Sequence, residues 1–168
     1  MTIELHRMIS EDISSSIQFE KNVLSEKLDV SLDIDGKKIT LLIALNKFTD
    51  SLYVEDLQGN GYYSNFQGKG TGTFLFNTAL QFLKNHYPDS ILVSGQMSTV
   101  GDPDEPDQAE ACRNFRSNFW QSFGFTVVPG DIGYEKVEAK LGELKIKPGR
   151  LLLGKFPCLV DISEFEEK

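Results

Sequence analysis

Residues 67–83 have the sequence Gln67-Gly68-Lys69-Gly70-Thr71-Gly72-Thr73, followed by Phe-Leu-Phe-Asn-Thr-Ala-Leu-Gln-Phe-Leu. The apolar side chains of residues 74–83 recur with the spacing of a helix that packs on other parts of the protein. Three glycines just before the helix let backbone N–H groups face a ligand, because no side chain blocks the approach. The N-terminal end of a helix is also partly positive. The turn therefore predicts an anion site, with a phosphate or pyrophosphate as the expected ligand; the alternative is a turn that only connects two elements.

The spacing of the glycines narrows the choice of phosphate motif. No Gly-Lys-Ser/Thr follows, as a P-loop requires, and the glycines do not form the Gly-x-Gly-x-x-Gly of a dinucleotide fold. The pattern is Gln-x-x-Gly-x-Gly, which resembles the acyl-CoA pyrophosphate loop of the GNAT superfamily of N-acetyltransferases. Residues 114–125, Asn-Phe-Arg-Ser-Asn-Phe-Trp-Gln-Ser-Phe-Gly-Phe, are similar to that family's helix ending in aromatic-aromatic-x-x-x-Gly-Phe. A predicted strand at 91–94 lies between the two motifs, and the resemblance covers residues 40 to 128.

The resemblance implies a fold, a reaction and a set of contacts. The implied fold is α/β (α+β), a single GNAT-like domain over 1–168 with a mixed, mostly antiparallel central sheet flanked by helices. The implied reaction is transfer of an acetyl group from acetyl-CoA to a primary amine of a small molecule or protein, by direct attack of the amine. The residues that the resemblance places against the co-substrate are Leu57, Tyr62, Gln67, Gly68, Lys69, Gly70, Thr71, Gly72, Thr73, Asn114 and Trp120.

A general base is expected in the strand that precedes the glycine loop. An amine is mostly protonated near pH 7, so it must lose a proton before it can attack a thioester. Family members often carry a Glu in this strand, which makes Glu55 the first candidate and Asp56 the second. Side chains alternate along a strand, so only one of the two is expected to face the cleft. The alternative is a pair of solvated carboxylates at a strand edge.

Two departures from the family pattern bear on activity. Many members place a Tyr near the CoA sulfur as general acid, where this chain has Trp120, and an indole N–H cannot pass a proton to a thiolate. Trp120 is then a core or cofactor-wall aromatic. Tyr62 stands where the family has a strand valine, and it could equally be an ordinary loop aromatic. These departures keep an alternative open: a CoA-binding or interaction module of the same fold with little or no transferase activity.

The order of elements follows from periodicity and turn residues. Asp35-Gly36 between two apolar runs is a strong hairpin signal, and Pro88 ends the helix that begins at Thr71. The predicted strands are 3–8, 28–34, 38–46, 52–57, 90–97 and 125–128, with helices over 10–27, 71–86 and 108–122. The remainder, with Ile146 and residues 151–153, is expected to supply at least one more strand.

Composition and charge set further limits. A net charge of −8 disfavours nucleic acid as a partner and suits a cationic substrate. No apolar run reaches the roughly 20 residues of a membrane span, and residues 1–7 lack the layout of a signal peptide. Cys112 and Cys158 are expected to be reduced thiols in the cytoplasm. No cluster with metal-ligand spacing is present, so no metal is expected; the oligomeric state is open, a homodimer included.

The most acidic stretch is 101–110, which contains Asp102, Asp104 and Glu105. A solvated loop is the expected role of these three carboxylates. Attraction of a cationic amine substrate is the sharper alternative.

Overall fold

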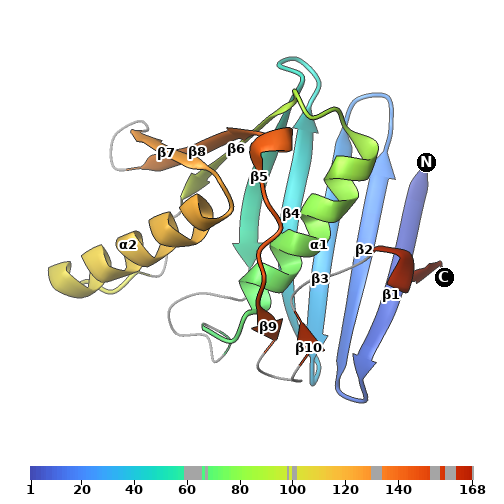
Figure 1. The fold of residues 1–168 in the computed structure, drawn as a ribbon, viewed down its shortest axis with the longest axis horizontal. Coiled ribbons are helices and arrows are strands. Elements are labelled where there is room, and N and C mark those ends of the chain that lie inside the picture. Colours follow the sequence, from blue (N-terminus) through green and yellow to red (C-terminus); the bar gives the residue numbers. More distant parts are fainter. Residues whose placement is uncertain are drawn as a thin grey trace.

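The fold is built on one large mixed sheet, seen in the computed structural model, which describes residues 1–58, 66, 68–97, 99, 102–129, 134–151, 156–157 and 162–167. Within these ranges nine strands form the sheet in the order β11-β1-β2-β3-β4-β5-β6-β8-β7 (Figure 1). The elements are β1 (Thr2–Ser10), β2 (Ile13–Lys21), β3 (Glu26–Ile34), β4 (Lys37–Asn46), β5 (Ser51–Gln58), α1 (Thr71–His86), β6 (Leu92–Met97), α2 (Pro106–Ser122), β7 (Thr126–Pro129), β8 (Glu135–Lys140), η1 (Leu141–Glu143), β9 (Arg150–Leu151), β10 (Phe156–Pro157), η2 (Ile162–Glu164) and β11 (Glu166–Glu167).

The sheet is antiparallel except at one junction. Strands β5 and β6 pair in parallel over Ser51–Val54 and Leu92–Gly95, and every other described pair in the sheet is antiparallel. A parallel pair needs a crossover between its strands, and α1 provides it. The predicted mixed, mostly antiparallel sheet with flanking helices is thus confirmed at this level of detail.

Residues 10–27, for which the sequence predicts a helix, instead form a turn, strand β2 and the start of β3. Glu11 and Asp12 lie in the tight turn between β1 and β2. Along β2 every second side chain in the first seven residues is buried, in the order Ile13, Ser15, Ile17 and Phe19. The hydroxyl of Ser15 donates to the carbonyl oxygen of Ser31 on β3 at 2.9 Å, which satisfies the one polar group in this buried row. The period of two therefore overrides the helix-start signal of the acidic turn.

The predicted hairpin at Asp35-Gly36 is confirmed. Both residues have positive φ, 52° and 75°, as the two central positions of a type I′ turn require. The backbone N–H of Gly36 also donates to the Asp33 carboxylate at 2.9 Å. This turn fixes the register of β3 and β4, which pair from Ile34–Lys37 to Glu26–Leu45.

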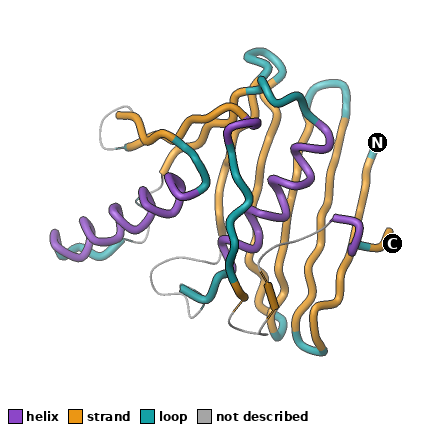
Figure 2. The backbone as a smooth tube through the Cα atoms, viewed as in Figure 1, coloured by secondary structure: helices purple, strands orange, loops and turns teal. Residues whose placement is uncertain are grey.

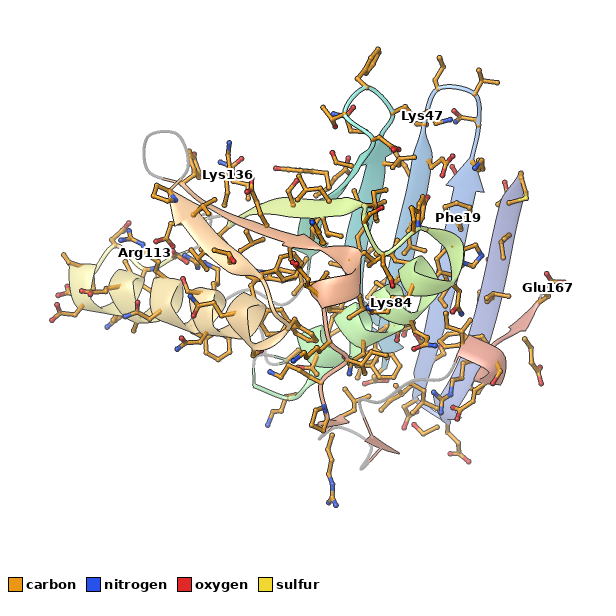
Figure 3. The ribbon with its side chains drawn as sticks, turned by 45° about the horizontal axis from the view of Figure 1, so that its top comes forward. Phe19, Lys47, Lys84, Arg113, Lys136 and Glu167 are labelled. Carbon is orange, nitrogen blue, oxygen red and sulfur yellow. The ribbon has the colours of Figure 1, made fainter. Side chains whose placement is uncertain are left out.

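Helix α1 has the predicted bounds and lies across one face of the sheet, over β3 and β4 (Figures 1 and 2). It is buried on most sides, because the segment after β8 covers its outer surface. The side chain of Asn77 exchanges two hydrogen bonds with the backbone of Lys147, at 2.9 and 3.0 Å. Lys84 donates to the carbonyl oxygen of Leu141 at 2.9 Å. Lys84 is labelled in Figure 3.

Helix α2 begins two residues before the predicted start and lies beside β7. Two further strands were predicted correctly in place, since β6 and β7 fall within or next to 90–97 and 125–128. The expectation of at least one more strand after β7 is confirmed: β8 is the longest of these strands and lies before Ile146, and Leu151 lies in the short strand β9. Ile146 itself is outside the strands.

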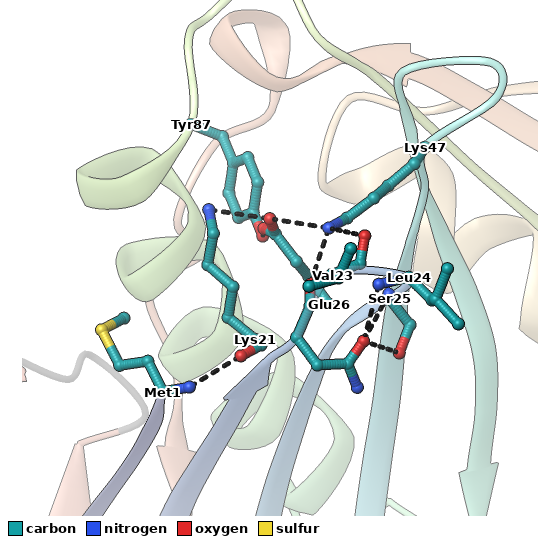
Figure 4. Close-up of polar contacts among 9 residues, drawn as sticks. Met1, Lys21, Val23, Leu24, Ser25, Glu26, Lys47 and Tyr87 are labelled. Atoms are coloured by element: carbon teal, nitrogen blue, oxygen red, sulfur yellow. Dashed lines mark hydrogen bonds and ion pairs between the residues drawn. The ribbon is translucent and has the colours of Figure 1, made fainter.

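A buried carboxylate joins the C-terminal end of α1 to the hairpin between β2 and β3. Glu26 is 5% exposed and accepts a hydrogen bond from the hydroxyl of Tyr87 at 2.7 Å. The ammonium groups of Lys21 and Lys47 lie 2.7 and 3.8 Å from its Oε1 (Figure 4). Burial raises the pKa of the Glu26 carboxyl, but the hydrogen bonds from Lys21 and Tyr87 and the nearby charges outweigh it, so the pKa lies below its usual range.

Candidate functional site

The glycine-rich turn enters α1 through two left-handed glycines. Gly68 and Gly70 have φ of 74° and 85°, and Gly70 is the residue that precedes the first helical turn. The N–H of Lys69 and the hydroxyl of Thr71 both donate to the carbonyl oxygen of Phe66, at 3.1 and 3.3 Å. The conformation thus depends on glycine, since positive φ is strained for other residues. Gln67, the first residue of the predicted motif, lies outside the described residues.

The surroundings of this turn suit an anion. No acidic side chain lies in the first turn of α1. A Cβ built on Gly68 meets no atom of the described residues within 4 Å, so on their side the space beside this residue is open. Lys69 is exposed, whereas Thr71 and Gly72 are buried and Thr73 is half-buried. Of the described loop residues, Gly68 and Lys69 are exposed, and Gly70 is half-buried.

Strands β5 and β6 separate at the end of the sheet that lies near the glycine-rich turn. Their described pairing stops at Val54 and Gly95, yet β5 continues to Gln58 and β6 to Met97. Figure 1 shows β6 running away from β5, while the start of α1 lies at the end of the sheet toward which β5 runs. Diverging parallel strands followed by a helix N-terminus leave a site at the carboxyl ends of the strands, where ligands of open α/β sheets commonly bind.

A bulge in β5 changes how its two acidic residues are placed. Leu42 pairs with Asp56, while the next residue, Ile43, pairs with Val54, so Glu55 is the extra residue. The expectation that Glu55 and Asp56 lie on opposite faces assumed a regular strand and no longer follows. Glu55 is exposed, and the side chain of Asp56 is outside the described part of the structure.

The other residues that the resemblance places against the co-substrate differ in their exposure. Leu57 is partly buried and packs against the hydrophobic core. Tyr62 falls in 59–65, outside the described residues. On α2, Asn114 is exposed, whereas Trp120 is 9% exposed. The Trp120 ring makes edge contacts with Phe76, Phe119 and Phe125 at centroid distances of 5.2, 5.0 and 5.5 Å.

An ion pair that sequence reasoning missed lies at the base of α2. The Arg116 guanidinium binds both carboxylate oxygens of Asp102, at 2.5 and 2.7 Å. The Asp102 side chain is only 14% exposed, so the expectation of a solvated loop is wrong for this residue. Asp104 and Glu105 are exposed, as expected of a solvated loop. Residues 102 and 116 belong to different elements, and neither carries a local signal that predicts the contact.

An open pocket of about 390 Å³ lies between α2 and the ends of β6, β7 and β8. Its apolar wall consists of Met97, Val127, Val128 and Pro129. Its polar wall consists of Thr99, Arg113, Arg116, Tyr134 and Glu135. Because Met97 is the last residue of β6, the pocket opens at the end of the sheet where β5 and β6 separate.

The described residues also bear on metal binding, membrane spanning and the state of the cysteines. In the described ranges, no group of three or more His, Cys, Asp or Glu side chains is placed to hold a metal ion. Neither described helix has the length and apolar composition needed to cross a bilayer. Cys112 is buried and unpaired, and Cys158 lies outside the described residues.

Comparison with known proteins adds no assignment to this geometry. No protein-family model matches the chain, and no curated protein matches its sequence.

Proposed function

We propose that the chain is an N-acetyltransferase that binds acetyl-CoA at residues 67–73 and transfers its acetyl group to a primary amine. The observation that carries the proposal is the turn at Gly68 and Gly70, which enters α1 at the end of the sheet where β5 and β6 part. Its open space, its exposed Lys69 and the absence of acidic side chains in the first turn of α1 suit a pyrophosphate. The element order strand–helix–strand–helix–strand over β5 to β7 is also the order that the resemblance implies.

The proposed chemistry is direct attack on the thioester carbon. The acceptor ammonium first loses a proton, the nitrogen–carbon bond forms, the carbon–sulfur bond breaks, and the second amine proton leaves with the thiol or the solvent. Glu55 is the proposed base, because it is exposed and its bulge lies directly beyond the last described pair between β5 and β6. Asp56 is the second candidate. A backbone N–H freed by the bulge is a suitable donor to the oxyanion.

A second function, CoA binding without turnover, is favoured by one observation. Trp120 replaces the phenol that many GNAT members use, and it packs among phenylalanine rings. A buried indole cannot protonate the departing thiolate. In that case the chain would bind the co-substrate and acetylate no amine.

The experiment is a calorimetric titration of the chain with acetyl-CoA, repeated with Gly68→Glu. The new carboxylate would stand in the proposed pyrophosphate site, and we expect binding to be lost. Gly36→Glu is the matched control, because Gly36 has nearly the same φ, 75° against 74°, and equally open surroundings. Backbone strain is therefore the same in both variants, and only the position of the charge differs.

The outcomes separate the two functions. Equal affinity in the Gly68→Glu variant and the wild type would refute the site. Acetyl-CoA binding with no acetylated product from any amine would favour the binding module. If the chain is a transferase, Glu55→Gln is expected to keep the affinity for acetyl-CoA and to lower turnover by roughly 10²-fold or more, the usual contribution of a general base.

A further inference from the structure

We propose that the pocket between α2 and β7 binds an amino acid with an apolar side chain, through Arg113 at its carboxylate and Glu135 at its ammonium group. This assignment names the amine acceptor and rests on the proposed acetyl transfer. The pocket volume of about 390 Å³ lies at the low end of the range for small-molecule sites. An apolar wall with a few convergent polar groups is also typical of such sites.

Arg113 is the cation available to a ligand. It lies on α2, on the side facing β7 (Figure 3), and it forms no hydrogen bond or ion pair with the described residues. Arg116, one turn further along the helix, is already bound by both oxygens of Asp102. Its charge is neutralised there, and its Nε is buried without a partner in the described ranges. Of the two guanidinium groups that line the pocket, that of Arg116 is thus neutralised, and that of Arg113 has no partner among the described residues and can bind a carboxylate through two hydrogen bonds.

Glu135 supplies the opposite charge, next to Ser117 on α2. Its carboxylate accepts a hydrogen bond from the hydroxyl of Ser117 at 3.5 Å. Ser117 follows Arg113 by four residues on the same helix face, so the two positions are separated by roughly 6 Å along the axis. Among the described residues that line the pocket, the charges outside an ion pair are therefore one cation, carried by Arg113, and one anion, which lies beside the helix position one turn further along. A molecule that carries both a carboxylate and an ammonium group complements this arrangement, whereas a simple anion would be repelled by Glu135.

The position of the pocket agrees with an acceptor site. Met97 ends β6, the strand that diverges from β5 at the level of Glu55. In the reaction the bound ammonium group loses a proton to Glu55, the proposed base, and its nitrogen attacks the thioester carbon. The carbon–sulfur bond breaks, and the second amine proton leaves with the thiol or the solvent. The products are an N-acetyl amino acid and a thiol. The apolar side chain of the amino acid would lie against Val127 and Val128.

The test is titration of the ¹⁵N-labelled chain with L-leucine, L-methionine and L-phenylalanine, with and without acetyl-CoA, followed by NMR shifts of α2 and β7. Leucinamide, which lacks the carboxylate, and N-acetyl-L-leucine, which lacks the ammonium group, are expected to bind at least about tenfold more weakly. Arg113→Gln and Glu135→Gln should each weaken leucine binding by at least about tenfold. Arg150→Gln, the same change at an exposed arginine outside the pocket, should leave binding unchanged.

Failure of this inference can be told apart from failure of the proposed function. Binding of acetyl-CoA, with none of the three amino acids bound in either condition, overturns the pocket assignment alone. Leucine binding that Arg113→Gln leaves unchanged also overturns it. Leucine binding that depends on Arg113, in a chain without affinity for acetyl-CoA, supports the pocket and overturns the transferase.

Discussion

Replacing Glu26 with Gln is expected to lower the free energy of unfolding by about 2 kcal/mol at pH 7. The Tyr87 hydroxyl donates to a carboxylate at 2.7 Å, and a bond to a charged partner contributes about 1 kcal/mol more than the neutral bond that an amide could keep. The ion pair with Lys21 adds at most about 1 kcal/mol, because the Lys21 side chain is 53% exposed and stays hydrated.

The loss should depend on pH in one direction. The folded-state pKa of Glu26 lies below its usual range, so the charged carboxylate contributes its full stability above the unfolded pKa of about 4.3. That contribution is lost as the pH falls through the lower folded-state pKa. Burial and the adjacent Glu26 carboxylate raise the pKa of Tyr87 above its usual range, so its hydroxyl remains a donor throughout. The difference between wild type and Glu26→Gln should therefore be greatest near neutral pH and shrink below pH of about 4.

Urea unfolding followed by fluorescence measures this difference, since Trp120 is the single tryptophan and is buried. Titrations at several values between pH 7 and pH 3 give the free energy for each variant. Glu20→Gln, the same change at an exposed position of β2, should alter stability by less than about 0.5 kcal/mol. A double-mutant cycle with Tyr87→Phe should give a coupling of about 1 kcal/mol at pH 7. A stability gap that stays constant over this pH range would refute the reasoning.

Two further changes test the packing at the C-terminal end of α2. Gly124→Ala should destabilise the fold by more than about 1 kcal/mol in the same urea assay. The reason is that Gly124 has a φ of 106° and a Cβ there would lie 2.9 Å from the carbonyl oxygen of Glu143. An unchanged unfolding midpoint would contradict this prediction. Trp120→Ala should lower the free energy of unfolding by about 3–5 kcal/mol, measured by calorimetric melting, because its ring fills a space among three phenylalanines. A loss below about 1 kcal/mol would show that this aromatic cluster does not hold α2 in place.

The parts of the fold that the sequence predicted well have strong local signals. The turn at Asp35-Gly36 needs two positive φ angles, and few residue pairs accept them. Helix α1 is bounded by glycine and proline. The region 10–27 was predicted wrongly because Ser10-Glu11-Asp12 has the composition of a helix start, while the small buried Ser15 conceals the alternation of β2. The position of β8 was not predicted for a related reason, since only Val137 and Ala139 mark its buried face among charged residues.

The candidate site likewise contains parts that local sequence predicts and parts that it does not. The glycine turn was predictable because its residues are contiguous and their conformation is local. The bulge at Glu55 depends on the pairing of β5 with β4, so a single strand does not reveal it. The pocket brings Arg113 on α2 together with Glu135 on β8. Contacts between residues on different elements need the tertiary arrangement, and spacing along the chain does not predict them.

The parallel junction between β5 and β6 has a consequence for the order of folding. Strands β1 to β5 are joined in sequence by turns of two to four residues, so each pair can form by closing a short loop. The pairing of β5 with β6 must instead wait until the whole of α1 has been placed between them. The first 58 residues are thus suited to fold early, even before the rest of the chain leaves the ribosome. The half that carries the proposed pocket would join last, and its backbone amides should exchange with solvent sooner than those of β2 to β4.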